Sequence, residues 1–267
     1  MRGDIAAKLD QARRVSADEG CFSWTSPEYQ RDILEFICAH RDCGSGIIEV
    51  GTYKGGLTAQ LSLICREYGW PLWTMDVDTS ALETASNLLN KLGLADNVTF
   101  HCGALDRFVQ SELPIGKPVL VVLDGDHRYD AVRRDICSIY KLPVLPYAAA
   151  FHDYSLRHPS TGERVDQAVR DELPHLVPTP IGARMMGNGP YPTQERPSED
   201  GHWWEVPGSE GAIVELKPRP RRWNPMVLEA GLRTLSAMRL VRRRPQTGAA
   251  TATLLRGMTP RRALLPG

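Results

Sequence analysis

Short apolar runs alternate with amphipathic stretches along most of the chain. Apolar runs of strand length fall at 47–50, 72–75, 98–102, 119–123 and 148–151. Between two of them, residues 82–92 carry apolar side chains at helical spacing, which predicts an amphipathic helix that ends near Gly93. Strands that alternate with helices indicate an α/β fold with a mostly parallel sheet.

Capping and turn residues predict where some of these elements begin and end. Ser26 followed by a proline predicts a helix start, because serine caps a helix and proline fits its first turn. Ser80 and Glu83 have the spacing of a capping box, which predicts a second helix start at Ser80. The apolar runs 203–206 and 212–216 flank a segment rich in proline and glycine and predict a β-hairpin.

The segment 47–58, IIEVGTYKGGLT, joins a strand to a helix through a glycine-rich turn. Glycine lets a ligand approach the backbone closely, and open α/β sheets bind ligands at the carboxyl ends of their strands. The spacing G-x-x-x-G-G matches neither the dinucleotide fingerprint G-x-G-x-x-G nor a P-loop. We therefore expect a ligand without a phosphate at this turn, with Glu49 accepting hydrogen bonds from an ammonium group.

Two acidic residues follow the next predicted strand. Asp76 ends that strand about 25 residues after the glycine turn, where Rossmann-like folds place a carboxylate that binds ribose hydroxyls. We expect Asp76 to have this role and Asp78 to be a solvated turn residue.

Polar residues also follow two later apolar strands. The run 119–123 leads into DGDHRY at 124–129, and the run 148–151 leads into HDY at 152–154. This D-G-D-H-x-Y-x-x-V-x-x-D pattern with a later H-D-Y resembles the methyltransferase domain 24 family of class I S-adenosylmethionine (SAM)-dependent methyltransferases. Relatives in that family include macrocin-type sugar O-methyltransferases and cephalosporin-hydroxylase-like proteins. The resemblance extends over residues 26–216, including GERVDQAV at 162–169, which is similar to the family's G-V-x-x-A-V segment.

The resemblance implies a fold, a cofactor and a set of binding residues. It implies a Rossmann-like, mostly parallel seven-stranded sheet with helices on both faces and a C-terminal antiparallel hairpin. The glycine turn is then the loop that wraps the methionine part of SAM, and the segment after the third strand lines the adenine. The residues expected to bind SAM are Glu49, Gly51, Tyr53, Gly55, Gly56, Thr58, Asp76, Ala104, Leu105 and Asp124. The chain has PVLPY at 143–147 where the family has a P-G-G turn, and we expect this stiffer turn to reshape the pocket edge.

Methyl transfer from SAM needs a deprotonated nucleophile held in line with the S–CH3 bond. Asp124 and Asp153, at neighbouring strand ends, predict a hard-cation site with His152 as a further ligand, and oxygen ligands favour Mg²⁺ (or Mn²⁺). His127 is the candidate general base, because an unperturbed histidine titrates near neutrality. The expected catalytic residues are His127, Asp124 and Asp153. In the competing interpretation Asp126 caps the following helix and His152 is a buried histidine without a ligand role.

The formal net charge of zero is the sum of two regions of opposite charge. Residues 217–267 contain 12 Lys+Arg and one acidic residue, net +11, so the remainder has 20 Lys+Arg and 31 Asp+Glu, net −11. Residues 225–243 predict a basic amphipathic helix, which could contact an anionic membrane surface, nucleic acid, the acidic remainder of the chain or a second subunit. We favour the last two. The expected domains are an N-terminal helical extension (1–25), a methyltransferase domain (26–216) and a basic extension (217–267) with a disordered end.

Cysteine usage and hydropathy bear on the compartment. The six cysteines are scattered without a C-x-x-C pair, the start lacks a signal-peptide pattern, and no apolar run has the length of a membrane span. These features predict a cytoplasmic protein with reduced thiols.

The sequence therefore predicts a metal-assisted O-methyltransferase that acts on a sugar or a small natural product, with a homo-oligomer as one option. An RNA methyltransferase that uses the basic tail is the first alternative. Against it, Asp153 stands where a lysine-using 2′-O-methyltransferase would not place a second carboxylate, and no D-P-P-Y motif occurs. The second alternative is a SAM-binding scaffold protein without catalysis. The acidic residues at four predicted strand ends argue against such a loss of function.

Overall fold

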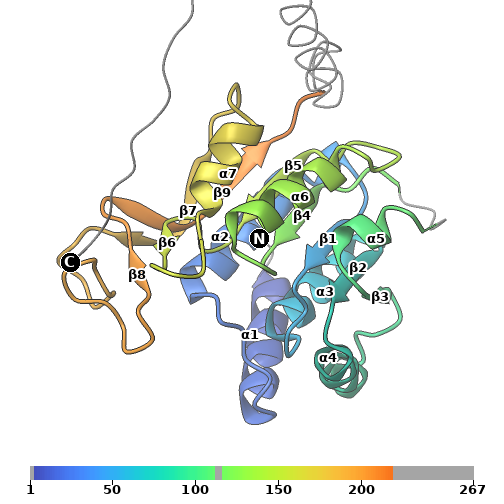
Figure 1. Ribbon diagram of the computed structural model, residues 1–267. Helices are drawn as coiled ribbons and strands as arrows, with labels where there is room; N and C mark the ends of the chain where they lie inside the picture. Colours follow the sequence, from blue (N-terminus) through green and yellow to red (C-terminus); the bar gives the residue numbers. More distant parts are fainter. Residues whose placement is uncertain (1–2, 112–115, 219–267) are drawn as a thin grey trace, which may run out of the picture. The chain divides into compact units, whose positions relative to one another are not determined.

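The computed structural model describes residues 3–111 and 116–218, with side chains described from residue 5 onward (Figure 1). The predictions that concern the amphipathic helix at 225–243 lie outside the described residues. A seven-stranded sheet has the order β3-β2-β1-β4-β5-β9-β7. Its strands are β1 (Ile47–Val50), β2 (Leu72–Asp76), β3 (Val98–Cys102), β4 (Leu120–Leu123), β5 (Ala148–Phe151), β7 (Thr179–Met185) and β9 (Gly208–Glu215).

The first five of these strands are parallel, and β9 is antiparallel to both β5 and β7. The parallel strands bring their carboxyl ends to one edge of the sheet, with Val50 level with Met75 on one side and Leu123 on the other. This arrangement confirms the predicted Rossmann-like fold with a C-terminal antiparallel pair.

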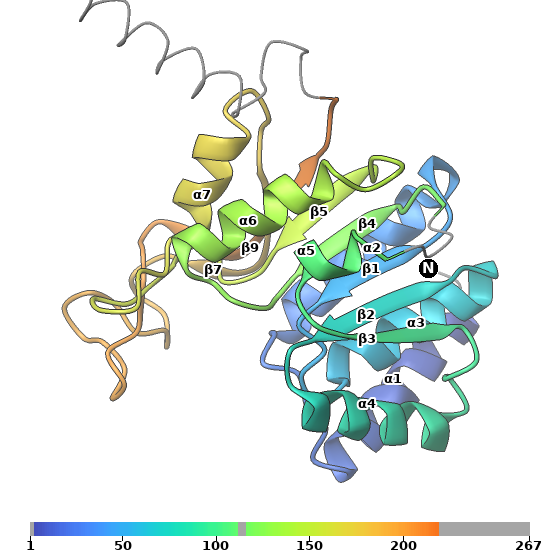
Figure 2. The same cartoon turned by 45° about the vertical axis from the view of Figure 1, so that its right-hand side comes forward.

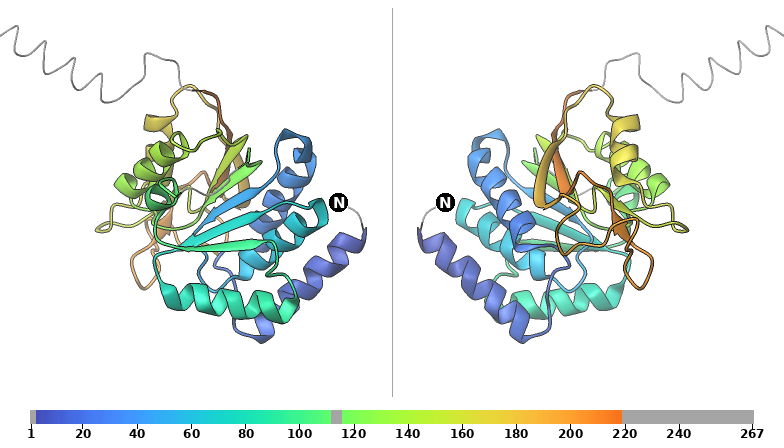
Figure 3. Two further views of the ribbon diagram at one scale, coloured as in Figure 1. Left: turned by 90° about the vertical axis from the view of Figure 1, so that its right-hand side faces the viewer. Right: turned by 90° about the vertical axis from the view of Figure 1, so that its left-hand side faces the viewer.

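Helices cover both faces of the sheet (Figures 2 and 3). The helices are α1 (Gly3–Asp18), α2 (Pro27–Ala39), α3 (Gly56–Tyr68), α4 (Thr79–Leu92), α5 (Leu105–Phe108), α6 (Tyr129–Ile139) and α7 (Val165–Glu172), with a short 3-10 turn at Arg41–Cys43. Successive strand residues point to opposite faces. Ile47 therefore packs with α1 to α4, whereas Ile48 packs with α5 to α7. None of the helices in the described part is both long and apolar enough to cross a membrane.

Two details of the predicted elements are wrong. The run 203–206 does not pair with β9, because β8 (Trp203–Trp204) pairs with β6 (Leu156–Arg157) in a separate two-stranded sheet. The antiparallel partner of β9 is β7, where Ile181, Ala183 and Met185 are buried. A proline and a glycine within β7 hid this strand from the sequence pattern.

The second detail concerns the start of α4. The helix begins at Thr79, and Asp78 rather than Ser80 is its N-cap, since the Asp78 side chain accepts a 2.9 Å hydrogen bond from the Ser80 backbone N–H. The predicted ends of this helix at Gly93 and the predicted cap of α2 at Ser26 are confirmed. Asp78 therefore has a structural role in the turn that follows Asp76.

Candidate functional site

A cavity of about 780 Å³ opens at the carboxyl edge of the sheet. The turns that follow β1, β2, β3, β4 and β5 line it together with residues 22–24, which precede α2. Its volume lies within the range of about 300 to 1,000 Å³ that is typical of small-molecule sites. The position is the one where open α/β sheets bind their ligands.

The glycine turn forms one wall of this cavity. Gly51 has a φ of 95°, and a Cβ atom there would lie only 2.0 Å from the backbone oxygen of Asp124. Glycine is therefore required for the close approach of the turn after β1 to the turn after β4. Tyr53 also has a positive φ, of 46°, and its backbone N–H donates a 2.9 Å hydrogen bond to Asp76. The contacts with Asp124 and Asp76 thus fix the conformation of the glycine turn at the cavity wall.

Three residues expected to bind the cofactor lie behind the cavity wall instead. Glu49 is fully buried, and its Oε2 accepts hydrogen bonds from the hydroxyl groups of Thr58, at 2.7 Å, and Thr74, at 2.6 Å. Burial raises the pKa of Glu49 to about 8. Gly55 packs against α4, where an added Cβ would lie 2.8 Å from the Cβ of Ala85. Glu49, Gly55 and Thr58 therefore support the turn and do not line the cavity.

The residues expected at the ribose and the adenine divide in the same way. Asp76 and Ala104 line the cavity, as do Gly51, Tyr53 and Gly56. Leu105 is fully buried and belongs to the hydrophobic cluster beneath the sheet. Leu105 is the first residue of α5, and its side chain points into the core. The sequence shows that the residue is apolar but not in which direction its side chain points.

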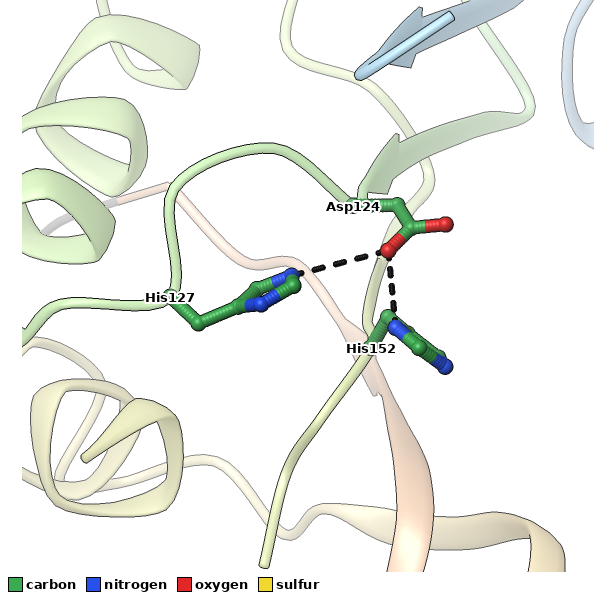
Figure 4. Close-up of side chains that lie close together, drawn as sticks. All are labelled: Asp124, His127 and His152. Carbon is green, nitrogen blue, oxygen red and sulfur yellow. Dashed lines mark ion pairs between the residues drawn. The ribbon is translucent and has the colours of Figure 1, made fainter. Parts of the chain in front are cut away.

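The turns after β4 and β5 bring two carboxylates and two histidines together in what we name the carboxylate–histidine cluster: Asp124, His127, His152 and Asp153. Figure 4 shows the first three of these side chains. Asp124 Oδ1 lies 2.7 Å from His152 Nδ1 and 3.5 Å from His127 Nε2. Asp153 Oδ2 lies 2.9 Å from His127 Nδ1. Each histidine therefore stands between the two carboxylates.

The electrostatics of the cluster follow from these contacts. Burial opposes the charged form of His127, but contacts with Asp124 and Asp153 outweigh it and raise the pKa of His127 to about 9. The pKa of His152 is raised well above its ordinary value, against burial, by the charges of the same two carboxylates. Burial would raise the pKa of Asp124, but the two histidines lower it. Protons on the histidines thus balance the two carboxylates.

The geometry of the cluster also fits a divalent cation. One ligand atom each from Asp124, His127 and His152 lies within 4.8 Å of the others. Among the described residues, His127 Nε2 and His152 Nδ1 are buried without an aligned hydrogen-bond partner, although both face Asp124. One carboxylate and two imidazoles suit Mn²⁺, Fe²⁺ or Zn²⁺ better than Mg²⁺, which prefers oxygen. The three residues that could bind a cation therefore include His127. The expected ligand Asp153 is not among them, and it contacts His127 through Nδ1.

Two further residues complete the surroundings of His152, and the sequence reasoning missed both. Glu210 of β9 is 4% exposed, and its Oε1 lies 3.4 Å from His152 Nε2. The same carboxylate accepts hydrogen bonds from the backbone N–H groups of Ser26, at 2.6 Å, and Ala183, at 3.0 Å. The ring of Tyr29 lies 4.9 Å from the His152 ring, edge to face. An acidic residue next to the apolar run 211–214 was the one available signal for Glu210.

Comparisons with known proteins agree with this architecture. Residues 48–154 match a family described as a methyltransferase domain. This segment is a methyltransferase domain. It contains the glycine turn, Asp76 and all four residues of the carboxylate–histidine cluster. The expected family, and with it a SAM-dependent methyltransferase of class I, is confirmed.

Solved structures show the same fold. The methyltransferase TomG from Streptomyces achromogenes, an O-methyltransferase involved in tomaymycin synthesis and solved with SAM, has a TM-score of 0.51 at 18% identity, over 79% of this chain and 90% of that one. A provisionally assigned O-methyltransferase from Klebsiella pneumoniae has a TM-score of 0.54 at 16% identity, over 79% and 90%. The SAH-bound methyltransferase PaMTH1 from Podospora anserina has a TM-score of 0.50 at 13% identity, over 81% and 89%. At these identities the likeness establishes the fold alone. A search of curated proteins found no match to this sequence.

Proposed function

We propose that this methyltransferase transfers the methyl group of SAM to a hydroxyl oxygen of a small acceptor, with a divalent cation held by Asp124, His127 and His152. The observation that carries the proposal is the convergence of these three side chains within 4.8 Å at the cavity. The acceptor class that we favour is a sugar or another hydroxylated small natural product.

Within the cavity the cofactor and the acceptor take different ends. Gly51, Asp76 and Ala104 lie at the ends of β1, β2 and β3, so they suit the methionine, ribose and adenine parts of SAM in that order. Asp124, His152 and Asp153 follow β4 and β5, on the other side of β1 in the sheet. The acceptor hydroxyl therefore lies at the carboxylate–histidine cluster, next to the methionine end of the cofactor.

The reaction places simple demands on the protein. The O–H bond of the acceptor breaks, and its proton passes to a basic group of the site. The oxygen then forms a bond to the methyl carbon, the S–CH3 bond breaks, and its electron pair stays on sulfur, leaving neutral S-adenosylhomocysteine (SAH). A bound divalent cation would lower the pKa of the hydroxyl and fix its orientation. Asp124, His127 and His152 would hold that cation, and Asp153 would hold the His127 ring through Nδ1.

His127 as an unaided general base is the second candidate mechanism. In that case the neutral form of His127, which predominates only above its raised pKa of about 9, accepts the proton on Nε2, so this mechanism predicts activity that rises with pH toward 9. Asp153, at 2.9 Å from Nδ1, stabilises the resulting imidazolium. The same nitrogen cannot ligate a cation and accept the proton. The two mechanisms are therefore exclusive, and removing the cation tells them apart.

The charge of the cavity favours a small acceptor over RNA. Two arginines, Arg128 and Arg134, line it, against five aspartates: Asp76, Asp124, Asp126, Asp135 and Asp153. A nucleic-acid strand would bring its phosphates to these carboxylates, whereas proteins bind phosphate backbones mainly through lysine and arginine.

The test uses the full chain and measures binding before turnover. Calorimetry is expected to show SAH binding, and the paramagnetic signal of Mn²⁺ is expected to show stoichiometric metal binding that Asp124→Asn abolishes. Methyl transfer from labelled SAM to a panel of sugars and phenols should then stop in EDTA. His175→Ala is a matched control for His127→Ala, because His175 lines a different hollow beside α2. Binding of NADH without binding of SAH would overturn the assignment, and full activity in EDTA would leave His127 as the base.

A further inference from the structure

Exposed aromatic side chains gather at the mouth of the active-site cavity. Nine large apolar side chains are exposed in the described part of the chain, and four of them line this cavity. We name three of these the aromatic rim: Phe22, at 44% exposure, Trp24, at 73%, and Tyr53, at 37%. Water-exposed aromatic surface of this kind is a feature of binding sites.

The three rings form a contiguous surface. The ring centroids of Phe22 and Trp24 lie 5.5 Å apart, those of Phe22 and Tyr53 lie 6.4 Å apart, and those of Trp24 and Tyr53 lie 6.5 Å apart. The Lys54 ammonium lies 4.9 Å from the Phe22 centroid and helps to hold that ring. Trp24, the most exposed of the three, keeps most of its surface open to solvent.

The backbone that carries the rim is fixed at both ends. The Cys21 N–H donates a 2.7 Å hydrogen bond to Ser16 of α1, and the Ser26 N–H donates to Glu210. Between them the chain passes Gly56 so closely that a Cβ there would lie 2.5 Å from the Ser23 nitrogen. The rim is therefore preformed, which lowers the entropic cost of binding a ligand.

The path of this segment assigns Phe22 and Trp24 to the acceptor, whereas Tyr53 belongs to the glycine turn and supports their rings from the cofactor side. The segment runs from the glycine turn, at Gly56, to Ser26, whose partner Glu210 also contacts His152. A molecule with its hydroxyl at the carboxylate–histidine cluster has this segment beside it, whereas Asp76 and Ala104 lie at the ends of strands on the far side of β1.

We infer that the aromatic rim binds the body of the acceptor and selects one with a planar aromatic ring that bears the reacting hydroxyl. This inference rests on the proposed function and narrows its acceptor class, from sugars and hydroxylated natural products to those whose reacting hydroxyl is on an aromatic ring. Aromatic faces stack on planar rings with an attraction beyond that of the buried area alone. A saturated ring of the same polarity gains less from such a surface.

The experiment compares two vicinal diols that differ in their rings. The protein is saturated with SAH and Mn²⁺ and titrated calorimetrically with 2,3-dihydroxynaphthalene and with cis-1,2-cyclohexanediol. The aromatic diol should bind at least tenfold more tightly. Trp24→Ala should weaken that binding on the order of fivefold to tenfold, and Trp24→Phe should restore most of it. Tyr191→Ala, an exposed aromatic that does not line the cavity, should change nothing.

Three results would overturn the inference. The two diols could bind alike, Trp24→Ala could leave the aromatic diol unaffected, or Trp24→Ala could weaken SAH, which would assign the rim to the cofactor. A protein that fails to bind SAH at the outset would instead contradict the proposed function, so the two failures are distinguishable. Circular dichroism of each variant checks that the fold is retained.

Discussion

Asp153 contacts the ring nitrogen of His127 that does not face Asp124: its Oδ2 lies 2.9 Å from His127 Nδ1. Asp153 adopts this position with a φ of 50°, which is rare for a residue other than glycine. Backbone strain of this kind is found at functional sites, where the surroundings enforce it. With Nδ1 occupied, Nε2 of His127 is the nitrogen that faces Asp124 and the cavity.

Asp153→Asn should separate catalysis from cofactor binding. The amide keeps the shape of the side chain but removes the charge that holds His127, so we expect methyl transfer to fall by about 10²-fold or more. The Kd for SAH should stay within about twofold, because Asp153 lies at the acceptor end of the cavity. Calorimetry and a turnover assay measure the two effects. If SAH binding is lost together with activity, Asp153 positions the cofactor.

Asp76→Ala should weaken SAM binding several-fold. The substitution removes a carboxylate at the expected ribose position and also the acceptor for the Tyr53 N–H. Asp78→Ala is the matched control, since it removes the N-cap of α4 and should lower Tm without changing the Kd for SAM. Equal Kd values for the two variants would show that Asp76 has no part in binding.

Glu49→Gln should flatten the dependence of stability on pH. The pKa of Glu49 is about 8 in the fold against 4.5 for the ordinary side chain, so the folded state retains a proton that the unfolded state releases. The stabilisation is complete below pH 4.5 and is lost as pH rises toward 8, at about 1.4 kcal/mol per pH unit. Glutamine cannot ionise, and its oxygen can still accept from Thr58 and Thr74.

Urea unfolding between pH 5 and pH 6.5 is the appropriate measurement for Glu49→Gln. The pKa values of His127 and His152 are also raised, but their contribution is lost above the ordinary histidine value of 6.5. Asp135, with a pKa raised to about 7, contributes a second slope that both proteins share. The difference between wild type and variant therefore reports Glu49, and parallel curves would contradict the buried neutral carboxyl.

Glu210→Ala should destabilise the protein by about 1 to 3 kcal/mol. The substitution leaves the backbone N–H groups of Ser26 and Ala183 without their acceptor in a buried site. Glu210→Gln keeps an acceptor oxygen and should recover much of this stability while removing the charge behind His152. A role in positioning His152 predicts a reduced kcat for the glutamine variant at unchanged KM for SAM. Wild-type kcat in that variant would restrict Glu210 to a structural role.

The sequence was a good guide to the sheet and to the edge at which ligands bind. Parallel buried strands leave long apolar runs, so β1, β4 and β5 and the polar residues at their ends could be placed without coordinates. Because carboxyl ends of parallel strands meet at one edge, the proximity of Asp124 to Asp153 was also predictable. Strand β7 was not, since its proline and glycine break the pattern of an edge strand.

The finer geometry of the site depended on side-chain directions that a sequence does not contain. The resemblance to the methyltransferase family implies that the segments of Glu49 and Leu105 line the cofactor. In this structure both side chains are buried in the interior. Glu210 and Tyr29 are far apart in the sequence and meet at His152 only through the packing of α2 on β7 and the pairing of β7 with β9. Such long-range contacts follow from topology and packing, and no local pattern marks them.

The contact between Gly51 and Asp124 has a consequence for redesign. The two backbones touch where a single added carbon would have no room, so in the proposed arrangement the main chain beneath the cofactor and the main chain beneath the acceptor are in direct contact. A substitution made there to admit a new acceptor would disturb the methyl donor as well. Specificity can be altered more independently at the periphery, in the segment 22–24 before α2, where exchange leaves the shared floor intact.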